Sequence, residues 1–100
     1  MKQNDLIYEK HIHDIIVEEL FELHSIASLM WLIDRGREVD LQYNGKEGFI
    51  SKSGSSKTVS LWLDGTEQAF ESTEQLMDYA TVGGDHLKSI WKCVRLVNLW

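Results

Sequence analysis

The period of the hydrophobic pattern changes once along the chain, and this change constrains the fold more than any other feature. From about residue 8 to residue 35, apolar side chains recur every three or four residues, as on one face of a helix. From Val39 onward they alternate with polar ones, as on a strand with one buried face. A chain of 100 residues can bury a single core. The pattern predicts one α+β domain, with a long N-terminal helix packed on a four- to five-stranded antiparallel meander.

The first predicted element is one amphipathic helix over residues 8–35. Gly36 supplies the left-handed conformation that commonly follows a helix, and Arg35 places a cation near the negative end of the helix dipole. The second half of the helix is apolar nearly all round, so it is either covered by the sheet or buried in a partner, and a homodimer is possible. The residues of the apolar stripe are Ile12, Ile16, Leu20, Leu23, Ala27 and Met30.

Residues 38–71 predict two β-hairpins. Asn44-Gly45 and Asp64-Gly65 are turn dipeptides, and a flexible connection over residues 51–57 joins the hairpins. The missing side chain of Gly48 leaves space over its partner strand that an aromatic ring could fill. In the first hairpin, a two-residue turn sets these pairs: Val39 with Ile50, Leu41 with Gly48, and Tyr43 with Lys46.

Two short helices are predicted after the hairpins, over residues 73–81 and 85–91. Ser72 and Gln75 have the spacing of a capping box at the start of the first helix. Residues 93–99 are rich in β-branched and aliphatic side chains, which favours a last strand. A helix that continues to the end of the sequence is the alternative for this segment.

The charge and the aromatic content both point to binding of a protein. The chain carries a formal net charge of −6 and four tryptophans. Large aromatic side chains dominate protein interfaces, and a negative surface attracts a partner with a basic surface. The same charge repels phosphates, so no direct binding of nucleic acid is expected. Solubility alone is the simpler explanation of a charge of this size.

The cysteine content and the absence of long apolar runs indicate the cellular compartment of the protein. Cys93 is the only cysteine, so neither an internal disulfide nor a zinc module fits, and we expect a buried, unreactive thiol in the last strand. No run approaches the roughly 20 apolar residues that a membrane-spanning helix needs. We expect a cytoplasmic protein with no membrane contact.

Candidate catalytic and metal-binding patterns are weak. His11 and His13 with Glu18 resemble part of a metal site, but residues two apart on a helix point about 200° away from each other. We therefore expect surface histidines there, and structural roles for His24 and His86. The sequence contains neither a nucleophile elbow nor a phosphate-binding loop. No catalytic residue, metal ligand or cofactor is predicted, and a small metal-dependent enzyme would require the histidines to converge.

The tryptophans divide into core and contact candidates. Trp31 and Trp91 follow the apolar patterns of their helices and are expected in the core. Trp62 lies on the polar face of its strand, where it is either covered by another element or exposed for a partner. Trp100 could lie beside Lys92 or Arg95 in a cation–π contact, or be loose. The candidate partner-binding residues are Trp62, Trp100, Glu18, Glu22, Asp40, Asp64, Glu67 and Glu71.

Residues 37–91 resemble small uncharacterised proteins of Gram-positive bacteria and their phages or mobile elements. The resemblance rests on the hairpin Tyr43-Asn44-Gly45-Lys46, on the segment 70–77, and on the ending Leu87-Lys88-Ser89-Ile90-Trp91. Residues 92–95 depart from the acidic residues usual after that tryptophan. The resemblance carries no catalytic residues and implies an accessory protein of a mobile element.

Among small acidic proteins of this kind, inhibitors of host defence nucleases form a prominent class, with anti-CRISPR proteins as the example. A CRISPR effector nuclease is therefore a possible partner, because carboxylates can replace phosphates in its basic channel. An immunity protein or antitoxin that neutralises a cognate toxin is the alternative, since it would use the same acidic, aromatic surface.

Overall fold

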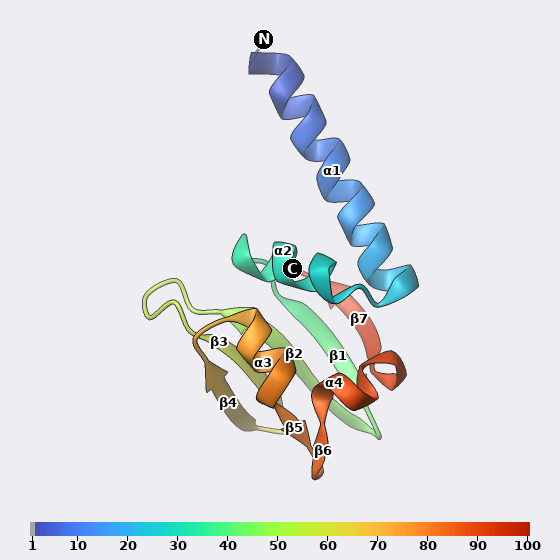
Figure 1. Ribbon diagram of the computed structural model, residues 1–100, viewed down its shortest axis with the longest axis vertical. Helices are drawn as coiled ribbons and strands as arrows, with labels where there is room; N and C mark the ends of the chain where they lie inside the picture. The colour runs from blue at the N-terminus through green and yellow to red at the C-terminus, as the bar shows by residue number, and fades with distance from the viewer. Residues whose placement is uncertain (1) are drawn as a thin grey trace.

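The computed structural model describes the backbone of residues 2–100 and the side chains of residues 10–100. It shows an α+β fold with the helices first, as predicted (Figure 1). The helices are α1 (Lys2–Leu23), α2 (Ile26–Asp34), α3 (Thr73–Tyr79), α4 (Leu87–Ile90) and the 3₁₀ turn η1 (Trp91–Cys93). The strands are β1 (Val39–Tyr43), β2 (Lys46–Lys52), β3 (Val59–Leu63), β4 (Thr66–Phe70), β5 (Thr81–Val82), β6 (Asp85–His86) and β7 (Arg95–Leu99).

The main sheet has five antiparallel strands in the order β4-β3-β2-β1-β7. The predicted four-stranded meander is confirmed, and the pairing of Val39 with Ile50 in the first hairpin is as expected. The last segment is a strand, because β7 pairs with β1 along the edge that the meander leaves free. The register of β7 shifts between Asp40 and Leu41, where a bulge interrupts the ladder.

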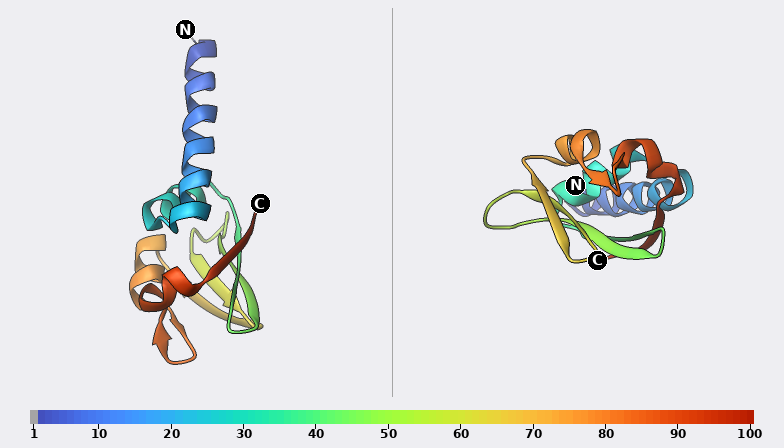
Figure 2. Two further views of the ribbon diagram at one scale, coloured as in Figure 1. Left: turned by 90° about the vertical axis from the view of Figure 1, so that its right-hand side faces the viewer. Right: turned by 90° about the horizontal axis from the view of Figure 1, so that it is seen from below.

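The helices lie on one face of the sheet, and the other face is open (Figure 2). Strand alternation turns the apolar residues of β1, β2 and β3 toward α2, α3 and α4, where the core forms. α2 is therefore covered within the chain itself, which decides between the two environments predicted for the apolar second half of the long helix. The fully buried members of this core include Leu20, Leu29, Leu32, Ile33, Val39, Ile50, Leu61, Leu76 and Leu87.

The predicted single helix over residues 8–35 is wrong in its continuity, because the chain breaks between α1 and α2. His24 has a left-handed backbone with φ of 52°, and the Ser25 hydroxyl accepts from the Ser28 N–H at 3.1 Å to start α2. The break frees the His24 carbonyl, which accepts from the Trp91 indole N–H at 2.8 Å. The His24 imidazole also bonds the Val94 carbonyl at 2.7 Å. Contacts with the C-terminal part of the chain therefore fix the bend.

The bend divides the predicted apolar stripe. Leu20 is fully buried, whereas Leu23 is 70% exposed and Ala27 is also exposed. α1 begins at Lys2 rather than near residue 8 and extends away from the sheet, which gives the molecule a longest dimension of 50 Å (Figure 1). Within the described part of the chain, none of the helices combines the length and the apolar character needed to span a membrane.

The C-terminal helices are shorter than predicted. The capping hydroxyl of Ser72 accepts from the Gln75 N–H at 3.1 Å, but α3 ends at Tyr79 rather than at residue 81. Gly83 and Gly84 both have positive φ and turn the chain into the small β5–β6 ribbon. Residues 85 and 86 are therefore strand, and only residues 87–90 of the predicted 85–91 helix are α-helical.

Gly48 lies where β2 and β3 approach each other closely. A Cβ atom placed on Gly48 would overlap the Trp62 carbonyl oxygen and lie 2.9 Å from both Cα and Cδ1 of Leu63. The predicted space above this glycine is thus filled by the neighbouring strand and by Leu63, not by an aromatic ring. The reason is that the β2–β3 register pairs Gly48 directly with Leu63.

We expect Gly48→Ala to destabilise the protein by about 1–3 kcal/mol or more, because β3 must move to admit the methyl group. Urea denaturation followed by circular dichroism measures this loss. Gly54→Ala is the matched control, since a Cβ there meets nothing within 4 Å. Equal stability of the two variants would contradict the close approach at Gly48.

Candidate binding surface on the open face of the sheet

The sheet face that turns away from the helices is called the open face here. Because Val39, Leu41, Ile50 and Leu61 are buried in the core, the residues between them on the strands project to the other side. The open face consists of Glu38, Asp40 and Gln42 from β1 and its start, Glu47, Phe49 and Ser51 from β2, Ser60 and Trp62 from β3, Glu67 and Ala69 from β4, and Arg95 and Val97 from β7.

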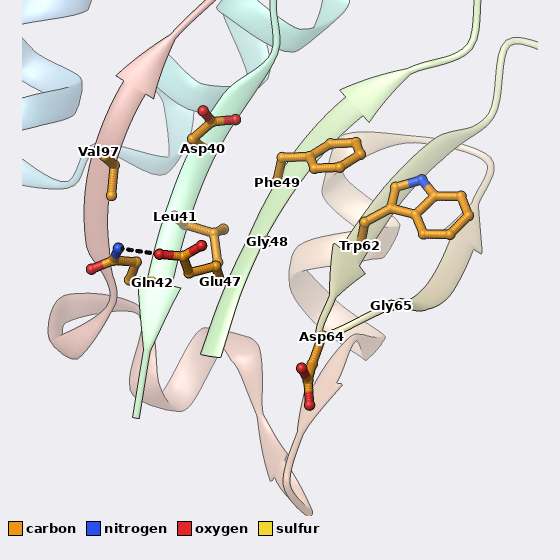
Figure 3. A pocket seen from close by; sticks show the side chains of 10 residues that line it. All are labelled: Asp40, Leu41, Gln42, Glu47, Gly48, Phe49, Trp62, Asp64, Gly65 and Val97. Carbon is orange, nitrogen blue, oxygen red and sulfur yellow. Dashed lines mark hydrogen bonds between the residues drawn. The ribbon is translucent and has the colours of Figure 1, made fainter. Parts of the chain in front are cut away.

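Phe49 and Trp62 form an aromatic pair at the centre of the open face. They are direct partners in the β2–β3 register, with ring centroids 6.2 Å apart and planes inclined by 22° (Figure 3). Both side chains are half-buried. Trp62 therefore lies on an uncovered face, with Phe49 rather than another layer of structure beside it.

Carboxylates flank this pair along one row of the sheet. The register sets Asp40 opposite Phe49, and Glu67 opposite Trp62. A shallow groove of about 330 Å³ runs between β1 and β3 over Gly48 (Figure 3). The side chains that line it include Asp40, Glu47, Phe49, Trp62, Asp64 and Val97.

Neutral donors orient three of the open-face carboxylates. Asp40 Oδ2 accepts from the Trp100 indole N–H at 2.7 Å. Glu47 Oε1 accepts from the Gln42 amide at 3.0 Å, as Figure 3 shows. Glu67 Oε2 accepts from the Ser60 hydroxyl at 2.7 Å.

These carboxylates have no cationic partner among the side chains of residues 10–100. The ion pairs in that part of the chain are His13 with Asp14 and Lys88 with Asp78. The open-face carboxylates therefore form no ion pair with a described side chain, and the cation nearest to them in the sheet register is Arg95, opposite Gln42 on β7.

Trp100 extends the open face past the end of β7. Its backbone N–H donates to the Glu38 carbonyl at 2.7 Å, and its indole bonds Asp40. Neither of the two alternatives for Trp100 holds, a cation–π contact with Lys92 or Arg95 or a loose side chain, because strand pairing with β1 carries Trp100 to Asp40. The ring remains 65% exposed, so it is available for contact.

The structure brings together only part of the predicted contact set. Asp40, Asp64 and Trp62 line the groove, with Glu67 beside them in the sheet. The other three acidic candidates lie elsewhere: Glu18 and Glu22 are exposed on α1, which is on the helical side, and Glu71 follows β4, where its N–H donates to the Gln75 side chain at 3.2 Å.

Sequence reasoning missed Phe49, Glu47 and Glu38. The hairpin register at Asn44-Gly45 already set Phe49 opposite Asp40, so one signal for it was present. Its pairing with Trp62 depends on β2–β3 register across residues 53–58, which no turn dipeptide specifies.

The remaining tryptophans differ from each other. Trp91 is 3% exposed and belongs to the core, as predicted. Trp31, also expected in the core, is only partly buried and packs against the edge of the core, with the Arg35 guanidinium 3.4 Å from its ring centroid and His13 beside it. Cys93, expected in the core, is exposed because η1 turns Trp91 inward and Cys93 outward.

The histidines do not converge. His11 and His86 are exposed, His13 contacts Trp31 and Arg37, and His24 bonds Val94. From residue 10 onward, no three side chains of metal-binding type are close enough together to hold a metal ion.

Glu38 is the one open-face carboxyl with a shifted pKa. Partial burial raises its pKa, and repulsion from the nearby Asp40 carboxylate raises it further. A raised pKa means that the folded state binds the proton more tightly than the unfolded state. Ionised Glu38 therefore costs stability above the folded-state pKa, and that cost disappears as the pH falls through it.

We expect Glu38→Gln to be more stable than the wild type at about pH 7, and the difference to narrow at about pH 4, where the carboxyl is protonated in both states. Thermal unfolding at both pH values measures the difference. Glu18→Gln, exposed on α1, should follow the wild type closely at each pH. A gap between Glu38→Gln and the wild type that grows on acidification would contradict the assignment.

We compared the chain with models of protein families, with curated proteins and with solved structures. None of these three comparisons finds a match. The functional argument therefore starts from the aromatic pair, the groove and the carboxylates of the open face.

Proposed function

We propose that this chain is a non-catalytic binding protein whose open face docks against a basic surface of a partner protein. The observation that carries the proposal is the Phe49–Trp62 pair, half-buried on a sheet face that none of the described helices or strands covers. Protein interfaces combine an aromatic centre with a polar rim, and large aromatics supply most of their binding energy.

The charge of the open face supports a basic partner. Asp40, Glu47 and Glu67 surround the aromatic pair, and none of them forms an ion pair with a described side chain. Like charges held together repel each other, and a partner rich in arginine and lysine relieves that repulsion. The same field would speed the encounter of the two proteins at low salt.

A nuclease of host defence is the partner class that we propose. The resemblance of residues 37–91 to proteins of phages and mobile elements suggests an inhibitor, in the manner of anti-CRISPR proteins. Such a nuclease binds nucleic acid in a positively charged channel. Carboxylates arrayed on a sheet can occupy phosphate positions in that channel and exclude the nucleic acid.

An immunity protein or antitoxin would use the same surface against a cognate toxin. The two proposals differ in which protein is bound and inhibited. The wild-type chain as bait in lysates of Gram-positive hosts, followed by mass spectrometry and a nuclease assay on the captured partner, distinguishes them. An enzyme is less well supported, because the histidines that it would require lie apart.

We expect Trp62→Ala to weaken binding of the captured partner at least about tenfold, roughly 1.4 kcal/mol, while the protein stays folded. The reason is that Trp62 contacts Phe49 on the open face and lies outside the core. Calorimetric titration gives the affinity, and circular dichroism confirms the fold. Tyr79→Ala is the matched control, since Tyr79 is 67% exposed on α3, on the opposite side of the sheet.

Two results would contradict the proposed function. One is an unchanged affinity of folded Trp62→Ala for its partner. The other is an equal loss in Tyr79→Ala, which would place the contact on the helical side of the molecule.

A further inference from the structure

We infer that the groove over Gly48 binds an arginine side chain of the partner protein. The inference rests on the proposed function and deepens it, because it names the chemical group that the open face recognises. An exposed guanidinium on a protein or peptide is the ligand, with Trp62 on one side of it and carboxylates on the other.

The groove has the size for one long side chain. It encloses about 330 Å³ and lies open to solvent between β1 and β3, so a side chain can enter from above the sheet. Gly48 contributes backbone atoms to its lining. Phe49 and Trp62 lie at one side of the groove, and Asp40 and Asp64 lie toward its two ends (Figure 3).

The aromatic rings of Phe49 and Trp62 at one side of the groove favour a flat cation. A guanidinium stacks on an indole ring through cation–π attraction and planar contact, whereas an ammonium keeps a tight hydration shell. The chain itself contains such a contact, because the Arg35 guanidinium lies 3.4 Å from the centroid of the Trp31 ring. Trp62 has no comparable cation among the described side chains, since Arg35 over Trp31 is the cation–π contact found there.

The carboxylate side favours a ligand with several N–H groups. Asp40 and Glu47 each line the groove, and each accepts a neutral donor through one oxygen. Those bonds hold the carboxylates in place, and Glu47 keeps its second oxygen for a ligand. A guanidinium presents five N–H donors in a fixed plane and can bond carboxylates while its face stacks on Trp62.

The test compares hexaarginine with hexalysine, two peptides of equal charge, on the full chain labelled with ¹⁵N at about 150 mM salt. We expect hexaarginine to bind about fivefold more tightly than hexalysine, the range that an exposed cation–π contact supplies. We also expect the indole N–H signal of Trp62 to shift while that of buried Trp91 stays fixed.

Substitutions in the groove test which side chains cause the preference for hexaarginine over hexalysine. Trp62→Leu should reduce the arginine preference to less than about twofold. The double variant Glu47→Gln with Asp64→Asn should weaken both peptides, and it serves as a second measurement if Trp62→Leu does not fold. Glu18→Gln with Glu22→Gln removes the same charge from α1 and should leave the preference intact.

Equal affinity for the two peptides would overturn the inference, as would a preference that persists in folded Trp62→Leu. Neither result decides the proposed function, which is tested separately by the affinity of Trp62→Ala for the captured partner. If the partner binds through Trp62 while the peptides are not distinguished, the open face is an interface that does not select arginine.

Discussion

The five-stranded sheet buries one of its faces under the helices and leaves the other in contact with solvent. A strand turns alternate side chains to opposite faces, so each apolar residue that enters the core places its neighbours on the other side. In β3 the buried Val59, Leu61 and Leu63 thereby fix Ser60 and Trp62 on the open face. The helices pack on the apolar face of the sheet. The polar and aromatic side chains of the opposite face therefore remain in contact with solvent. The β2–β3 register then places Phe49 beside Trp62 on the open face.

The open face combines features that are usually separate on a protein surface. An aromatic pair would normally be buried, and carboxylates would normally be paired with cations or spread over the surface. Here Phe49 and Trp62 are stacked beside Asp40 and Glu47, and the carboxylates are held by neutral donors. Burial, and next to it the Asp40 carboxylate, raise the pKa of Glu38 at the β1 end of this face. In the proposed complex, a basic partner would pair its cations with these carboxylates and stack a flat side chain on the aromatic pair.

Local chemistry predicted some elements well and others poorly. The hairpin at Asn44-Gly45 was predictable because two residues fix both the turn and the register. The start of α3 was predictable because Ser72 caps it within four residues. The break after α1 was not, because it depends on bonds from His24 to Trp91 and Val94, which lie far along the chain. The candidate site was half predictable: Trp62, Asp40, Asp64 and Glu67 were identified by residue type, whereas Phe49 required the register of β3.

The sequence by itself determined which residues alternate between core and solvent, where the tight turns lie, and that the chain is acidic and rich in tryptophan. These properties are local, since each depends on neighbours a few residues away. Only the tertiary structure decided that Trp62 meets Phe49, that Trp100 bonds Asp40, and that Glu18 and Glu22 lie apart from the other acidic candidates. The physical reason is that these relations depend on strand order and helix placement. Both are set by which apolar faces can be buried together, and no spacing along the chain encodes that directly.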